Sequence, residues 1–188
     1  MIINDRKFSD DGYIIDQDLF TDCYYRTCTS DYNGCGWIAA YNLRHALGQD
    51  VYYDDVRDEM DRMHEERVPG PTLMRVMRPY LAKYIPEVRE TVGKDEATKK
   101  AAESYAGIFR YTEGDVPHFI TFVRADTEAP LYRFFNVNDD IIDDIFEMQR
   151  FAEEHFLKNS VIALTVDRFS GRFQILKDRP AGEPEYKA

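Results

Sequence analysis

Cys35 and His118 are the residues whose types and places in the chain are best suited to covalent chemistry. Cys35 follows the turn-forming pair Asn33 and Gly34 and opens the segment 35–48, in which apolar residues recur at helical spacing. A thiol at the first turn of a helix faces the positive end of the helix dipole and unpaired backbone N–H groups, which favour the reactive thiolate. The same N–H groups can stabilise the oxyanion that forms when sulfur attacks a carbonyl carbon. Cys35 is therefore predicted to be a nucleophile in acyl chemistry.

A thiolate nucleophile needs a partner that exchanges protons with it, and that partner needs a group that fixes its orientation. His118 opens a β-rich run, so its imidazole would project from a rigid strand end. The next run, 131–137, would return beside it as a hairpin and bring Asn136 or Asn138 next to the imidazole. Asp139 is a third candidate for this orienting role. Strand register is not fixed by sequence, so the choice among the three stays open.

Both candidates depend on the elements that would carry them. An irregular or short-stranded lead-in is predicted over residues 1–32. A turn is predicted at 31–34, directly before Cys35. Helices are expected at 35–48 with Gly48 as the C-cap glycine, at 53–67, at 73–83 with Thr72 as N-cap and a break near Pro79, at 95–104 and at 142–157. Strands are expected at 88–92, 105–111, 118–124, 131–137, 161–166 and 169–176. Helices that precede a run of strands indicate an α+β fold.

Three segments resemble papain-like cysteine peptidases. The segment Asn33–Gly36 before an alanine-rich helix is similar to the nucleophile segment of the bacteriocin-leader (double-glycine) peptidase branch. The segment Pro117–Val123 resembles the histidine strand of that branch, and Phe134–Asp139 resembles the strand that follows it. The order of Cys, His and Asn or Asp also matches, and the resemblance spans roughly residues 28–166.

The resemblance implies a papain-like fold in which a central N-terminal helix packs against a mostly antiparallel sheet. It implies a triad of Cys35, His118 and Asn136 that hydrolyses a peptide or amide bond, with a peptide or protein as substrate. Asn33 is the candidate for completing the oxyanion hole beside the backbone N–H of Cys35. The chemistry requires no metal and no organic cofactor.

The chain departs from the family pattern at three places. Trp37 replaces the usual proline after Cys-Gly, and Pro117 stands where the branch has a glycine. Thr29 occupies the position of the glutamine that completes the oxyanion hole in papain-like enzymes, so Asn33 or Asp31 would have to substitute. Loss of one oxyanion donor costs about a hundredfold to a thousandfold in rate and does not abolish catalysis.

Two other activities fit the same residues. One is a papain-like domain that no longer catalyses and binds a peptide or partner protein. The other is an acyltransferase that moves the acyl group to an amine. A metal site is disfavoured, because the spacing of Cys23, Cys28, Cys35 and His45 matches no common zinc pattern.

Length and composition bound the remaining possibilities. With 188 residues, 44% of them hydrophobic, the chain is expected to form a single domain over 1–177 and a disordered tail over 178–188. The formal net charge of −11 disfavours nucleic acid and anionic membranes as partners. The three cysteines do not suggest a disulfide framework, and a cytoplasmic location is expected because no export signal or membrane span is recognised. The oligomeric state is left open.

Overall fold

The computed structural model describes residues 7–66, 68–125, 129–137 and 145–167. A six-stranded sheet in the order β3-β8-β4-β5-β6-β7 lies at its centre, and each neighbouring pair of strands is antiparallel. The strands are β3 (Arg89–Val92), β4 (Ala106–Glu113), β5 (Val116–Arg124), β6 (Leu131–Phe135), β7 (Ile145–Glu147) and β8 (Ile162–Val166). The expected α+β class and antiparallel sheet are confirmed.

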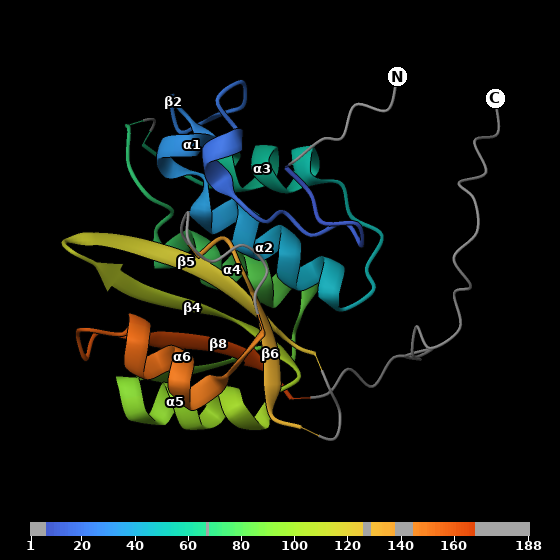
Figure 1. Cartoon of the computed structure of the whole chain (residues 1–188). Helices are drawn as coiled ribbons and strands as arrows, with labels where there is room; N and C mark the ends of the chain where they lie inside the picture. The colour runs from blue at the N-terminus through green and yellow to red at the C-terminus, as the bar shows by residue number, and fades with distance from the viewer. Residues whose placement is uncertain (1–6, 67, 126–128, 138–144, 168–188) are drawn as a thin grey trace, which may run out of the picture.

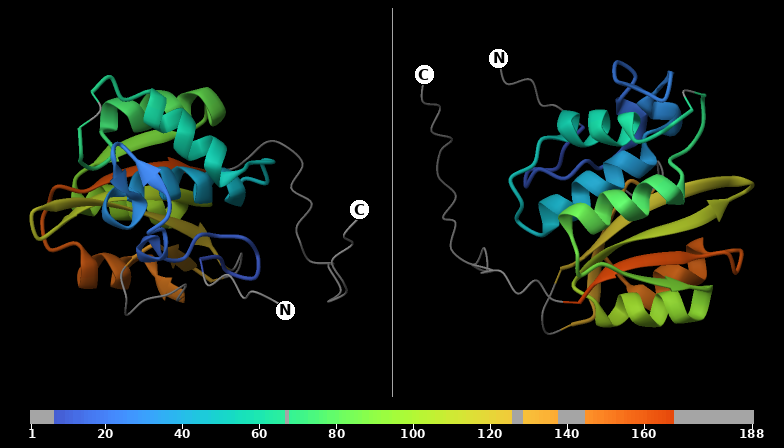
Figure 2. Two further views of the ribbon diagram at one scale, coloured as in Figure 1. Left: turned by 90° about the horizontal axis from the view of Figure 1, so that it is seen from above. Right: turned by 180° about the vertical axis from the view of Figure 1, so that it is seen from behind.

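Helices cover both faces of this sheet (Figures 1 and 2). On one face lie α1 (Ser30–Asn33), α2 (Cys35–Ala46), α3 (Tyr53–Arg62) and α4 (Met74–Tyr84), and on the other lie α5 (Lys94–Glu103) and α6 (Met148–His155). A short 3-10 helix, η1 (Gln17–Leu19), and a small hairpin of β1 (Tyr24–Tyr25) and β2 (Cys28–Thr29) precede α1. Because each face of the sheet is covered, the structure has two apolar cores.

Helix α2 is the central helix of the first core. Nearly every residue in it is buried, and Ala39 and Ala40 let its backbone approach β5 closely. The hydroxyl of Thr121 on β5 donates to the backbone carbonyl of Ala39 over 3.1 Å, which joins the helix to the strand. Gly48 has a φ of 68°, the left-handed conformation that ends helices and that glycine adopts without strain, as expected for the C-cap. The predicted central helix is confirmed.

Alternation along β5 separates the two cores. Phe119 and Val123 belong to the core under α2, whereas Ile120 and Phe122 belong to the core under α5 and α6. Gly107 lies opposite Phe122 on β4, and a Cβ at this glycine would be 2.6 Å from the phenyl ring. The packing of Phe122 therefore requires glycine on the neighbouring strand.

Four local predictions were wrong, three of them on the course of helices and turns. Segment 31–34 is not a turn, because residues 31–33 belong to the short helix α1 and Gly34 is its C-cap. Helix α4 runs through Pro79 without a break. Pro79 has no N–H to donate to the carbonyl of Arg75. Both residues lie on the exposed side of the helix, where water can bond to that carbonyl. The expected helix at 142–157 begins only at Met148, and strand β7 pairs with β6 just before it.

Thr72 is not the N-cap of α4. The cap position is Leu73, and the Thr72 hydroxyl is hydrogen-bonded to the hydroxyl of Tyr25 instead. The expected strand at 169–176 and the expected tail at 178–188 lie outside the described residues.

Candidate active site at the start of helix α2

Cys35 is the first residue of α2, as predicted. Helix α1 ends at Asn33, and Gly34 joins the two helices with its N–H bonded to the carbonyl of Ser30 over 2.7 Å. A Cβ at Gly34 would lie 2.4 Å from that carbonyl, so the close approach of the two helices requires glycine here. The indole N–H of Trp37 donates to the Ser30 hydroxyl over 3.2 Å, which joins the first turn of α2 to the start of α1. Cys35 thus lies on a rigid helix start.

The Cys35 sulfur is buried and faces backbone donors. Only 4% of the residue is exposed, and this burial raises the pKa of the thiol to about 11. The backbone N–H groups of Phe119, Gly36 and Cys35 itself face the sulfur and lower the pKa in opposition to burial. The thiol is consequently neutral at neutral pH, although the donors that could stabilise a thiolate or an oxyanion are in place.

His118 lies on the strand next to this sulfur, and its imidazole contacts the end of β6. Its Nε2 is 2.6 Å from the backbone carbonyl of Asn136. Its cross-strand partner is Tyr111, and the two rings meet edge to face with centroids 5.8 Å apart. A carbonyl oxygen can only accept, so Nε2 carries the proton and Nδ1 is the basic nitrogen of the neutral ring.

Strand alternation gives the His118 side chain a definite starting direction. Phe119, the next residue, faces α2, so the Cβ of His118 leaves the sheet on the face that carries Ile120 and Phe122. The structure therefore brings Cys35 together with the backbone of β5, while the imidazole reaches the residue that follows strand β6, Asn136.

Asn136 contacts His118 through its main chain rather than through its side chain. The side-chain Oδ1 accepts the backbone N–H of Gln17 over 2.8 Å. The side-chain Nδ2 donates to the Gln17 amide oxygen over 3.2 Å and to the carbonyl of Phe119 over 3.4 Å. Asn136 has a φ of 62°, a left-handed conformation that asparagine tolerates better than most residues, and this turn directs its carbonyl toward the imidazole.

Asn33 is not placed to complete an oxyanion hole. Its Nδ2 donates to the carbonyl of Tyr25 over 2.7 Å and to the carbonyl of Gly70 over 3.4 Å, which engages both amide hydrogens. The residue is 2% exposed, and its amide joins α1 to strand β1 and to the segment that contains Gly70. The other candidate orienters, Asn138 and Asp139, lie outside the described residues.

Gln17 is the residue of this region that the sequence analysis missed. Its Nε2 donates to the carbonyl of Asp31 over 2.8 Å, and its backbone and side chain both bind Asn136. It therefore joins η1, α1 and the end of β6 around the start of α2. It is the single glutamine before Cys35 in the sequence, which was the available signal once the family pattern called for a glutamine upstream of the nucleophile.

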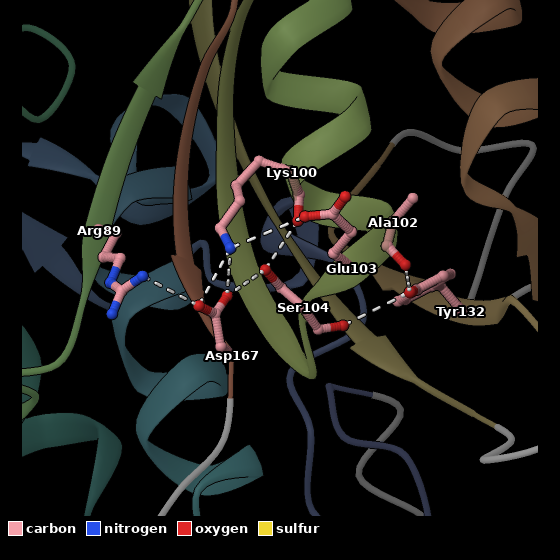
Figure 3. Close-up of polar contacts among 7 residues, drawn as sticks. All are labelled: Arg89, Lys100, Ala102, Glu103, Ser104, Tyr132 and Asp167. Carbon is pink, nitrogen blue, oxygen red and sulfur yellow. Dashed lines mark hydrogen bonds and ion pairs between the residues drawn. The ribbon is translucent and has the colours of Figure 1, made fainter.

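A second polar cluster lies at the other end of the sheet and is structural (Figure 3). Asp167 accepts the Ser104 hydroxyl over 3.0 Å and pairs with Lys100 at 2.9 Å and with Arg89 at 3.3 Å. Ser104 is completely buried, so its hydroxyl is not placed to meet a substrate. The cluster ties the end of α5 to β8 and β3.

Within the described ranges, His, Cys, Asp and Glu side chains nowhere gather in threes around a potential metal position. The same part of the chain contains no helix with the length and apolarity needed to cross a membrane. Comparison with protein-family models, with curated proteins and with solved structures returns no match to this chain.

Proposed function

We propose that the chain is a cysteine hydrolase of the papain-like kind that cleaves a peptide or amide bond with Cys35. The observation that carries the proposal is the place of Cys35 as the first residue of α2, where the backbone N–H groups of Phe119, Gly36 and Cys35 lower the pKa of the thiol against burial. Such a set suits both a thiolate and the oxyanion of a tetrahedral intermediate. His118 precedes Phe119 on β5, and its Nε2 is held by the carbonyl of Asn136, which leaves Nδ1 as the basic nitrogen for the same reaction.

In the proposed reaction the Cys35 thiol gives its proton to His118, and the sulfur bonds to the substrate carbonyl carbon. The intermediate then expels the amine, which takes the proton from His118, and a thioester remains. Water gives a proton to the same imidazole and attacks the thioester, which releases the acid and restores the thiol. Asn136 holds the imidazole through its carbonyl, and Gln17 is a positioning residue because it fixes Asn136.

A binding module is the second candidate, and two observations favour it. Burial raises the pKa of the Cys35 thiol to about 11, which disfavours a resting thiolate. The His118 side chain also starts from the sheet face opposite α2. In that case the region around α2 would hold a peptide without cleaving it. An acyltransferase would use the same thioester but deliver the acyl group to an amine, which analysis of products with an added amine would reveal.

The test is cleavage of a mixture of synthetic peptides, read by mass spectrometry between about pH 5 and pH 9. Wild type and Cys28→Ala, a control at a half-buried cysteine on the β1–β2 hairpin, are expected to cleave the same peptides. Cys35→Ala should abolish cleavage, and His118→Ala should slow it at least about a hundredfold. Cleavage that survives Cys35→Ala, or peptides that bind wild type and remain intact, would reject the hydrolase proposal.

A further inference from the structure

The segment Pro69–Thr72 lies across the first turn of α2. In Figure 1 the chain between α3 and α4 passes beside α1 and the β1–β2 hairpin. The carbonyl of Gly70 accepts from Asn33 over 3.4 Å, and the carbonyl of Pro71 accepts from the Arg26 guanidinium. The Thr72 hydroxyl is 2.9 Å from the Tyr25 hydroxyl. Each of these contacts joins the segment to β1, α1 or the turn after β1.

Thr72 rests directly on the backbone of Gly36. A Cβ at Gly36 would lie 2.1 Å from the Thr72 hydroxyl oxygen and 2.2 Å from the Thr72 Cβ. The N–H of Gly36 is one of the groups that face the Cys35 sulfur, and Thr72 and Tyr25 are 3% and 1% exposed. The segment therefore seals the turn of α2 that carries the thiol.

His64 lies beneath the attachment of this segment and is poorly satisfied. Its Nδ1 is 2.8 Å from the carbonyl of Met60, so Nδ1 carries a proton and Nε2 is a bare acceptor. That Nε2 is buried and has no hydrogen-bond partner among the described residues. The residue is 6% exposed, and its ring meets the ring of Tyr25 edge to face at 5.6 Å.

We infer that Pro69–Thr72 is a latch that covers Cys35, and that protonation of His64 releases it. The charged groups around His64 are Arg26 after β1, Asp61 on α3 and Arg75 on α4. Two of the three are cations, so protonation of Nε2 would make His64 a further buried cation beside them, and its new N–H would have no hydrogen-bond acceptor among the described residues. Release of the latch lets water solvate the imidazolium.

The direction of the pH effect follows from burial. Burial of His64 lowers its pKa below the ordinary value of 6.5, whereas a solvated His64 in the released state regains that value. The closed state is thus most stable above the ordinary value, and it weakens as pH falls from there toward the lowered pKa. The opening equilibrium can change by up to about tenfold for each unit that separates the two pKa values.

The test measures how fast iodoacetamide alkylates Cys35, by peptide mass spectrometry, at about pH 5.5 and about pH 7.5. His64→Asn keeps an amide donor for the Met60 carbonyl but does not titrate. The ratio of the wild-type rate to the His64→Asn rate cancels the thiol's own ionisation, and it is expected to rise several-fold at the lower pH. A control histidine, His45→Asn at the other end of α2, should leave the wild-type pH dependence unchanged. A ratio that stays constant would overturn the role of His64.

The latch itself is tested by Thr72→Val, which keeps the shape of the side chain but loses the bond to Tyr25. Tyr25→Phe removes the same bond from the other partner, so one variant can replace the other if it folds poorly by circular dichroism. Either should speed alkylation of Cys35 by about two- to tenfold at both pH values, because a net hydrogen bond is lost from the closed state. Thr112→Val, which removes an exposed hydroxyl contact to Ser160, should have no effect. Unchanged alkylation in both latch variants would overturn the inference, which concerns accessibility and does not depend on the proposed hydrolysis.

Discussion

The backbone carbonyl of Asn136 lies 2.6 Å from Nε2 of His118, while the side chain of the same asparagine is bound to Gln17. The left-handed φ of 62° at Asn136 is what turns the carbonyl to the imidazole. The asparagine therefore fixes the histidine tautomer through its main chain and fixes its own conformation through its side chain. Gln17 contributes to the site indirectly, because it holds Asn136 in place.

Asn136→Ala is expected to lower the free energy of unfolding by about 1–3 kcal/mol, because it leaves the partly buried N–H of Gln17 without its acceptor. Alanine also disfavours the left-handed conformation by roughly 1–2 kcal/mol. Asn136→Gly removes the same side-chain bonds without that strain, so it should be more stable than Asn136→Ala. Urea unfolding measures both. Equal stability of the two variants would mean that the positive φ is not maintained in solution.

The predicted strands largely match the structure because each is a short run of β-branched and aromatic residues whose burial decides its conformation. Segments 118–124 and 131–137 became β5 and β6 with small changes at their ends. Strand β7 was missed because Ile145 and Phe146 also fit the helical period of the residues that follow. Only the pairing with β6 selects the strand, and that pairing is a long-range contact.

The site was predictable in its parts rather than in its geometry. The place of Cys35 at a helix start follows from local signals, namely Asn33 and Gly34 before an apolar helix. The face from which His118 projects does not, because a slip of one residue in register moves a side chain to the other face. The contact between Thr72 and Gly36 depends on the path of the segment between α3 and α4 across α2, which no local sequence pattern predicts.

The pH dependence of Cys35 alkylation separates the two candidate functions. Burial raises the pKa of this thiol to about 11, so its reaction with iodoacetamide should increase about tenfold for each pH unit above about pH 6.5, where His64 keeps the latch closed. The thiolate form is absent at low pH and develops only as pH rises toward that value. A rate that is already high near pH 6 and falls in His118→Ala would instead demonstrate a thiolate–imidazolium pair. Peptide mass spectrometry reads Cys23 and Cys28 in the same sample as internal references.

Gly36→Ala tests the contact beneath the latch. The added methyl group would overlap Thr72, so the free energy of unfolding should fall by about 1–3 kcal/mol unless the segment moves away. The double variant Gly36→Ala with Thr72→Gly removes the overlapping atoms and should recover part of the loss. A double-mutant cycle by urea unfolding measures this coupling. Additive effects would show that the two residues do not touch in solution.

Acid should weaken the cluster around Asp167. The hydrogen bond from Lys100, together with that from Ser104 and the charge of Arg89, holds the pKa of Asp167 below its ordinary value of 3.8, against a smaller opposing effect of burial. A depressed carboxyl pKa gives stability that is fully present above the ordinary value and is lost as pH falls through the lowered one. Asp167→Asn should therefore lower the free energy of unfolding at neutral pH, and the difference from wild type should shrink below about pH 3.8.

The expected loss for Asp167→Asn is about 0.5–1.5 kcal/mol, since the Asp167 side chain is 36% exposed and water screens its ion pairs. Asp115→Asn is the matched control, because Asp115 also pairs with a lysine, Lys158, but is fully exposed. Its stability should stay within about 0.5 kcal/mol of wild type at every pH. Urea unfolding of the three proteins at neutral and acid pH, at low and high salt, provides the comparison. If Asp167→Asn and Asp115→Asn behave alike, the cluster does not tie α5 to the sheet, and Ser104 must be held by its bond to the Lys100 carbonyl alone.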